Sequence, residues 1–191
     1  ALMIDLVRLA GAAGARLILG RATGLDPARR QITVAGWGDV GYDAASLDIG
    51  IGSGLPDLPG FAEHGVAAKP LDAYAERWQA FLAKDLPDPH VTVIGAGAGG
   101  VELAMAMAFR LQGLGRTPRI TLVEAASPLR EVGAAARAAL LARLGAAGID
   151  LRSGAAPLRV EPGALILPGD ALRSDLTVGV AGARPQGWLR G

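Results

Sequence analysis

Strand-like and helix-like apolar patterns alternate in the second half of the chain. Residues 91–94 and 120–124 are short runs of β-favouring residues, and residues 101–111 and 132–147 have helical periodicity. A third short run follows at residues 149–152. Strands that alternate with helices indicate a parallel sheet covered by its crossover helices. The pattern therefore predicts an α/β fold with a Rossmann-like domain.

Shorter elements are expected around this domain. Before residue 55 the pattern predicts a helix at residues 2–13. It then predicts short strands at residues 16–19, 22–25, 31–34 and 44–51, and the last of these is expected to be buried. Prolines make residues 55–65 a crossover, and a helix follows from Pro70. Its Tyr74, Trp78 and Phe81 lie at helical spacing, which is more typical of core packing than of a ligand platform. Residues 157–182 predict a β-meander followed by a strand.

The two ends of the chain share a pattern that indicates an internal duplication. Glycines and alanines of residues 145–154 recur 134 positions earlier, in residues 11–20, and the order of the expected elements agrees. In the second copy, a strand, a glycine turn, a helix and a strand precede the repeat, whereas nothing precedes it in the first. We therefore expect the sequence to be a fragment whose first copy lacks its own nucleotide-binding half.

A glycine motif joins the first strand to its helix. Gly95, Gly97 and Gly100 have the G-x-G-x-x-G spacing. The first glycine permits a tight turn, the second lets a pyrophosphate approach, and the third lets helix and strand pack closely. The helix N-terminus then presents free N–H groups and the positive end of its dipole. On the motif alone, a tight strand-to-helix turn without a ligand is the alternative.

An acidic residue supports the nucleotide interpretation. Glu124 ends the second strand, 24 positions after Gly100. This is close to the separation of about 20 residues expected for a carboxylate that binds the adenosine ribose. The alternative for Glu124 is a solvated acid at a strand end.

Composition excludes several other functions. The net charge is +1 and the basic residues are scattered, which gives no electrostatic support for binding nucleic acid or an anionic membrane surface. There is no cysteine, so these residues contain neither a disulfide nor a thiolate zinc site. The two histidines, His64 and His90, each lie beside loop signals, and no metal site is expected. We expect a cytoplasmic protein without a membrane-spanning segment, either free or peripheral at the inner face of the membrane.

Several motifs together resemble one family. Residues 93–104 are similar to the NADH-binding turn of type II NADH dehydrogenases, and residues 121–125 to their second strand. Residues 180–185 resemble the strand end that meets the nicotinamide. The chain thus resembles the pyridine nucleotide-dependent flavoprotein oxidoreductases with two dinucleotide-binding domains, one for FAD and one for NAD(P)H. Asp48-Ile-Gly50, which stands where Ala-Thr-Gly is usual, is similar to the modules fused to selenide, water dikinase.

The resemblance implies a division of the chain by cofactor. Residues 1–58 would be the remnant of a homologous FAD-binding domain that lacks its glycine motif, and residues 59–89 a crossover and linker helix. Residues 90–191 would be the NAD(P)H-binding domain with its β-meander crossover. The C-terminal Gly-Asp flavin motif has no counterpart, because Gly169-Asp170 is expected to be a turn.

The resemblance also assigns roles to residues. The pyrophosphate would lie over the three motif glycines, with N–H groups of residues 98–101 donating. Glu124 would bind the ribose and favour NADH over NADPH by repelling a 2′-phosphate, although Arg130 could offset this repulsion. Glu102 would lie near the nicotinamide, or would be a helix-start carboxylate favoured by the dipole. The expected cofactor-binding residues are Gly95, Ala96, Gly97, Ala98, Gly99, Gly100, Val101, Glu102, Glu124, Ala125 and Gly182, with no catalytic side chain and no metal ligand.

The implied reaction is hydride transfer from NADH to FAD in the full-length protein, and onward to an unidentified small acceptor such as a quinone. The fragment alone is expected to be inactive, and the resemblance also allows a homodimer. The alternative is a non-catalytic regulatory or docking module that binds NAD(H) or FAD. A purely structural part of a larger assembly is a third hypothesis.

Overall fold

The computed structural model describes residues 4–52, 55, 57–182 and 185–189. The chain divides into two units, which are described separately. Unit 1 is Ala1–Ile49 with Gln186–Gly191, and unit 2 is Gly50–Pro185. The predicted division at residues 58 and 89 concerns which cofactor each part binds, and it stays a prediction.

Unit 2 is built on a five-stranded parallel sheet. Its strand order is β4 (Gly65–Ala67), β11 (Leu176–Gly179), β5 (His90–Ile94), β6 (Arg119–Glu124) and β7 (Asp150–Ser153). This arrangement confirms the α/β fold of Rossmann type. The edge strand β4 was not predicted, because three residues are too few to show a period. It follows the short helix α2 (Phe61–His64).

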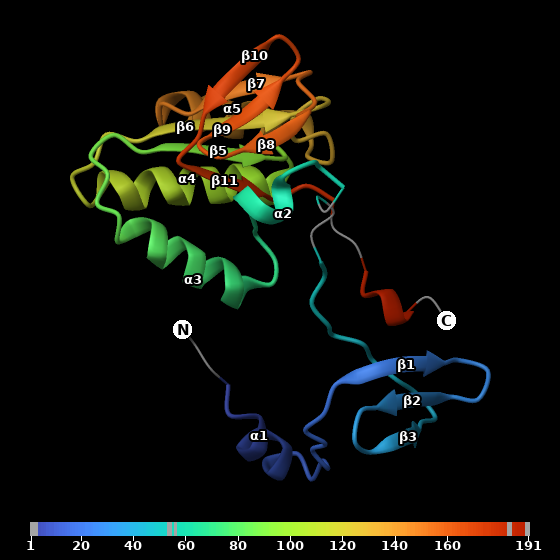
Figure 1. The fold of residues 1–191 in the computed structure, drawn as a ribbon. Coiled ribbons are helices and arrows are strands. Elements are labelled where there is room, and N and C mark those ends of the chain that lie inside the picture. The colour runs from blue at the N-terminus through green and yellow to red at the C-terminus, as the bar shows by residue number, and fades with distance from the viewer. Residues whose placement is uncertain (1–3, 53–54, 56, 183–184, 190–191) are drawn as a thin grey trace. The chain divides into compact units, whose positions relative to one another are not determined.

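The two faces of the sheet are covered differently (Figure 1). The helices α3 (Leu71–Leu82), α4 (Ala98–Gln112) and α5 (Ala134–Ala146) pack on one face. An antiparallel meander of β8 (Arg159–Glu161), β9 (Ala164–Leu167) and β10 (Asp170–Arg173) packs on the other. In β5, Val91 and Val93 pack with the helices, whereas Ile94 packs with the meander. Burial of both faces explains why β5 appears in the sequence as a continuous apolar run.

The aromatic residues of α3 are part of the core, as expected. Tyr74 and Phe81 are buried, and Trp78 packs against the same cluster. The rings of Trp78 and Phe81 stack with centroids 5.7 Å apart.

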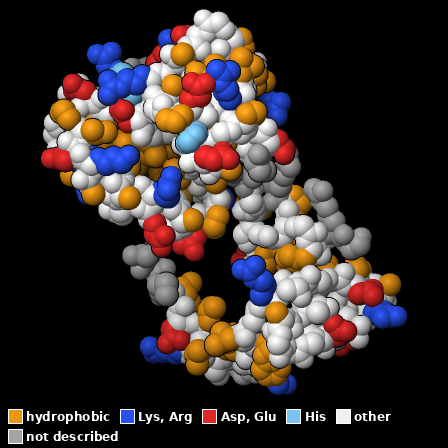
Figure 2. Space-filling model, viewed as in Figure 1, with side chains coloured by type: hydrophobic (Ala, Val, Ile, Leu, Met, Phe, Trp, Pro, Cys, Tyr) orange, Lys and Arg blue, Asp and Glu red, His pale blue; other side chains and the backbone are white. Residues whose placement is uncertain are grey.

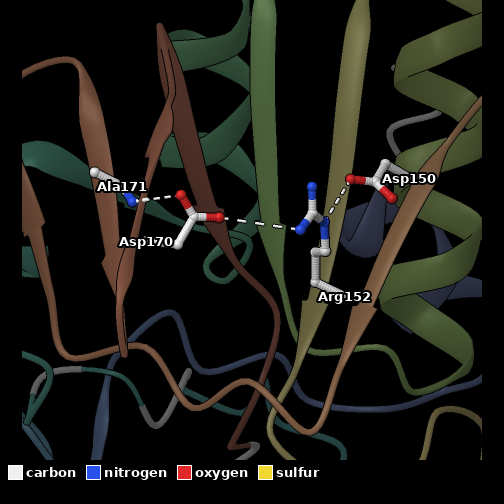
Figure 3. Close-up of polar contacts among 4 residues, drawn as sticks. All are labelled: Asp150, Arg152, Asp170 and Ala171. Atoms are coloured by element: carbon white, nitrogen blue, oxygen red, sulfur yellow. Dashed lines mark hydrogen bonds and ion pairs between the residues drawn. The ribbon is translucent and has the colours of Figure 1, made fainter.

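An arginine links the sheet to the meander (Figure 3). Arg152 of β7 donates from Nε to Asp150 Oδ2 at 2.7 Å, and its Nη1 lies 4.0 Å from Asp170 Oδ2 at the start of β10. The hydrogen bond to Asp150 and the attraction of both carboxylates raise the pKa of Arg152. The contact joins the edge strand of the sheet to the start of β10 at the protein surface.

Unit 1 contains the helix α1 (Leu6–Ala12) and a meander of β1 (Ala22–Asp26), β2 (Gln31–Val34) and β3 (Gly38–Gly41). The short helix η1 (Gly187–Leu189) contacts β1. The helix predicted at residues 2–13 is confirmed over Leu6–Ala12, while residues 2 and 3 lie outside the described residues. The strands at residues 22–25 and 31–34 are confirmed. The predicted strands at residues 16–19 and 44–51 are wrong, since both segments are irregular and residues 44–51 are largely exposed.

Much of the apolar surface of unit 1 is solvent-exposed (Figure 2). Helix α1 has no buried residue, and Leu6, Val7 and Leu9 of this helix are 56%, 67% and 56% exposed. Trp37, at the turn between β2 and β3, is 54% exposed. Among the described residues of the chain, no helix combines the length and apolar character needed to cross a membrane.

The burial of Tyr74 makes stability sensitive to alkaline pH. Burial raises the pKa of its hydroxyl from 10.0 to about 12. The unfolded chain loses this proton near pH 10 and the folded chain near pH 12, so the free energy of unfolding falls between these values. We expect urea denaturation of Tyr74→Phe to show a smaller loss of stability over this range than the wild type. Tyr42→Phe, in unit 1, is the control, and an equal alkaline loss in both variants would contradict the assignment.

Candidate dinucleotide-binding site

The three motif glycines have different surroundings. Gly95 has φ +105°, and a β-carbon on it would lie 2.8 Å from the backbone nitrogen of Ala181. A β-carbon on Gly100 would collide with the carbonyl oxygen of Gly95. Gly97 has an ordinary extended backbone, and the atom nearest to an added β-carbon is Glu131 Oε2 at 3.9 Å. The fold itself therefore needs Gly95 and Gly100, whereas Gly97 leaves open space above the turn.

Helix α4 begins beneath this space. Gly97 is its N-cap residue, and no side chain caps the helix. The first helical hydrogen bond runs from the Val101 N–H to the Gly97 carbonyl at 3.1 Å. The N–H groups of Ala98, Gly99 and Gly100 precede this bond, so the helix does not use them. The Val101 N–H, which the resemblance implies as a donor to the pyrophosphate, donates within the helix, and its side chain is fully buried.

Glu124 connects the glycine turn to the end of β6. Its Oε2 accepts from the Ala96 N–H at 2.8 Å, and its Oε1 accepts from the Ala126 N–H at 3.0 Å. A carboxylate has about four lone-pair sites, so both oxygens keep capacity to accept from hydroxyls. Glu124 is therefore hydrogen-bonded to the backbone, and is not simply a solvated acid at a strand end.

The loop after β6 is also fixed to the turn. Leu129, which is buried and has φ +53°, donates its N–H to the Ala96 carbonyl at 2.8 Å. Ala96 is thus bonded on both sides, through its N–H to Glu124 and through its carbonyl to Leu129. The strand end and the loop together form one wall of the space above Gly97.

A cavity of about 480 Å³ lies over the turn. Seven of the predicted residues line it, namely Gly95, Ala96, Gly97, Gly99, Gly100, Glu124 and Gly182. The other four do not, namely Ala98, Val101, Glu102 and Ala125. The predicted motif and the predicted acid are therefore brought together in one place.

Glu102 lies in a neighbouring, mainly apolar cavity of about 470 Å³. The two cavities share Ile51, Gly99 and Val180, so they join along the carboxyl end of the sheet. Glu102 is accompanied there by Lys69, which adds the opposite charge. The first turn of α4 contains no acid, and Glu102 lies just beyond it. This position gives little support to the helix-dipole explanation of Glu102.

The sequence analysis did not identify several residues of the wall. Ser127, Leu129 and Glu131 come from the loop after β6, while Val180 and Ala181 follow β11. Their sequence signal is positional, because loops at the carboxyl ends of parallel strands border the ligand crevice. Among the described residues, no group of three or more His, Asp or Glu residues could hold a metal ion.

The collision between a β-carbon at position 100 and the Gly95 carbonyl can be tested by measuring the free energy of unfolding. We expect Gly100→Ala to lower the free energy of unfolding by about 1–3 kcal/mol, because backbone must shift to admit the methyl group. Gly99→Ala is the matched control, since its β-carbon would make an ordinary contact, 3.6 Å from Val180 Cγ1. Chemical denaturation measures both variants. Equal stability of Gly100→Ala and the wild type would contradict the close packing.

Comparison with solved structures shows the same fold in larger proteins. A ferredoxin reductase of the CYP199A2 system from Rhodopseudomonas palustris has a TM-score of 0.78 at 22% identity, over 96% of this chain and 45% of that one. The water-forming NADH oxidase from Lactobacillus brevis, bound to NADH, gives 0.65 at 20% identity, over 86% and 37%. NDH2 from Plasmodium falciparum, in complex with NADH, gives 0.69 at 14% identity, over 87% and 40%. The chain thus spans less than half the length of these proteins.

No curated protein matches the chain significantly. The model of one protein family, described as pyridine nucleotide-disulphide oxidoreductase, matches residues 9–187. The match extends over both units and includes the glycine turn, Glu124 and the end of β11. The chain therefore belongs to the pyridine nucleotide-disulphide oxidoreductase family.

Proposed function

We propose that this chain is the NADH-binding portion of an FAD-dependent NAD(P)H oxidoreductase. Within the family, we place the chain in a subgroup that is similar to type II NADH dehydrogenases and to the modules fused to selenide, water dikinase. The observation that carries it is the open space above Gly97, which is lined by Gly99 and Gly100 at the start of α4 and by Glu124. Membership of the family supports the reaction class.

The residues of the site suit the successive parts of a dinucleotide. The N–H groups of Ala98, Gly99 and Gly100 would donate to the pyrophosphate, and the helix dipole would add to the attraction. Glu124 would accept from the ribose hydroxyls, while remaining bonded to Ala96 and Ala126. The apolar cavity at Glu102 would hold the nicotinamide. In this proposal the chain binds and orients the nucleotide, and none of its side chains is assigned a chemical step.

The described residues of unit 1 do not fit an FAD site by themselves. Asp5 is the N-cap residue of helix α1, and its carboxylate accepts from the Arg8 N–H at 3.0 Å and would repel a phosphate. The glycines at 36, 38 and 41 repeat the G-x-G-x-x-G spacing, but they lie around the hairpin of β2 and β3 and precede no helix. We therefore assign FAD, which would receive the hydride, to the full-length protein. A quinone as the final acceptor, a homodimer and peripheral attachment to the membrane belong to the same proposal.

A non-catalytic module that holds NAD(H) is the second candidate. The exposed apolar side chains of α1 favour it, because such a surface suits docking to another protein. Purification of the native gene product distinguishes the two. Flavin absorbance that NADH bleaches supports the oxidoreductase, and a protein that binds NADH without flavin supports the module.

Nucleotide binding is expected to depend on the open space at Gly97. We expect Gly97→Val to keep the fold, because the extended backbone accommodates valine and open space surrounds its β-carbon. The side chain would fill the pyrophosphate position and weaken NADH binding at least about tenfold, or about 1.4 kcal/mol. Isothermal titration calorimetry measures the affinity.

Gly41→Val is the control for this substitution, since nothing lies within 4 Å of a β-carbon there. It should bind NADH as the wild type does. Unchanged NADH binding by Gly97→Val, with the fold verified by circular dichroism, would contradict the proposed site.

Glu124 is expected to set the preference for NADH over NADPH. A 2′-phosphate would meet its negative charge, so Glu124→Gln should bind NADPH more tightly relative to NADH. The absolute affinity for NADH should fall, because the amide cannot accept from Ala96 and Ala126 with both of its polar atoms. Calorimetric titration with both nucleotides gives the ratio. Glu102→Gln, in the neighbouring cavity, should leave the ratio unchanged, and a wild type that prefers NADPH would refute the role of Glu124.

A further inference from the structure

A carboxylate of the loop after β6 lies directly over the glycine turn. Glu131 Oε2 is the atom closest to the β-carbon position of Gly97, at 3.9 Å. Glu131 also lines the cavity that the dinucleotide would occupy. Its side chain is 66% exposed, so no packing holds it in this position.

The backbone that carries Glu131 is fixed on both sides. Leu129 is bonded to Ala96, and the Val132 N–H donates to the Leu129 carbonyl at 3.0 Å. The loop therefore holds the backbone of Glu131 beside the turn, while its exposed side chain has room to rotate. Only the side chain has to move for the space above Gly97 to open.

The second oxygen of Glu131 faces a cation. Arg130 Nε lies 3.7 Å from Glu131 Oε1, and Arg130 lines the same cavity. Glu131 therefore lies between a guanidinium group on one side and the N-cap residue of α4 on the other. Both surroundings favour an anion, because the start of a helix carries partial positive charge.

We propose that Glu131 is a built-in competitor for the phosphate end of the groove. A pyrophosphate that binds over Gly97 must displace the Glu131 carboxylate, and Arg130 then pairs with the phosphate instead. Two anions cannot share the space above one glycine, so the side chain rotates away as the ligand enters. The inference rests on the proposed function, since it assumes that the groove takes a nucleotide with a pyrophosphate.

The competition is specific for phosphate. Neutralising Glu131 should tighten the binding of ADP and NADH by about two- to fivefold, the range expected for an exposed pair of charges. The gain should shrink as salt is added, because screening weakens interactions between exposed charges. Adenosine has no phosphate, and its affinity should not change.

The experiment is calorimetric titration of the 191-residue chain and of Glu131→Gln with ADP, adenosine and NADH, at low and high salt. Glu161→Gln is the matched control, because Glu161 also pairs with a neighbouring arginine, Arg159, and does not line this cavity. Arg130→Gln should have the opposite effect and weaken ADP but not adenosine.

A salt-sensitive gain for ADP in Glu131→Gln alone would support the inference. A wild type and Glu131→Gln that bind ADP equally would overturn it and leave NADH binding intact. An equal gain for adenosine, or an equal gain in Glu161→Gln, would overturn it as well. If Arg130→Gln binds ADP as tightly as the wild type does, the proposed pairing of Arg130 with the phosphate is overturned. Absence of ADP and NADH binding in every protein would overturn both this inference and the proposed function.

Discussion

The site depends on the hydrogen bonds that hold the backbone of Ala96. Its N–H is bonded to Glu124 and its carbonyl to Leu129, so the end of β6 and the loop after it are both held to one residue of the glycine turn. The end of β11 joins them, since Val180 and Ala181 both donate to the Ile94 carbonyl, at 2.9 and 3.1 Å. Three carboxyl ends of neighbouring strands are thus tied together where the helix begins. These bonds therefore hold the residues that line the space above Gly97 in place around the start of α4.

The sequence was most informative where structure is local. The glycine motif, the helix after it and the acid at the end of β6 are each specified by adjacent residues, and all were predicted. The motif spacing alone was not sufficient, because the hairpin glycines at 36, 38 and 41 have it too. A strand before the glycines and a helix after them are what separate a phosphate-binding turn from a hairpin.

The two wrong strands of unit 1 have one physical cause. Residues 16–19 and 44–51 correspond, under the duplication, to β7 and β11, which lie in the parallel sheet of unit 2. A parallel strand needs neighbours distant in sequence, whereas the strands of a meander pair with the next ones in the chain. The described residues of unit 1 contain the meander but no parallel neighbour. With no parallel sheet among these residues to bury them, apolar side chains of α1 such as Leu6 stay exposed.

The two carboxylates of the cavity differ in how firmly they are held, and this difference decides their roles. Glu124 accepts two backbone N–H groups, and a hydrogen bond to a charged group contributes about 1.5–3 kcal/mol. Glu131 has an exposed ion pair with Arg130, an interaction worth about 0–1 kcal/mol. A ligand that enters the groove can therefore move Glu131 at little cost but must adapt to Glu124. Glu124 is suited to recognise the neutral hydroxyls of a ribose, while Glu131 gives way to a stronger anion.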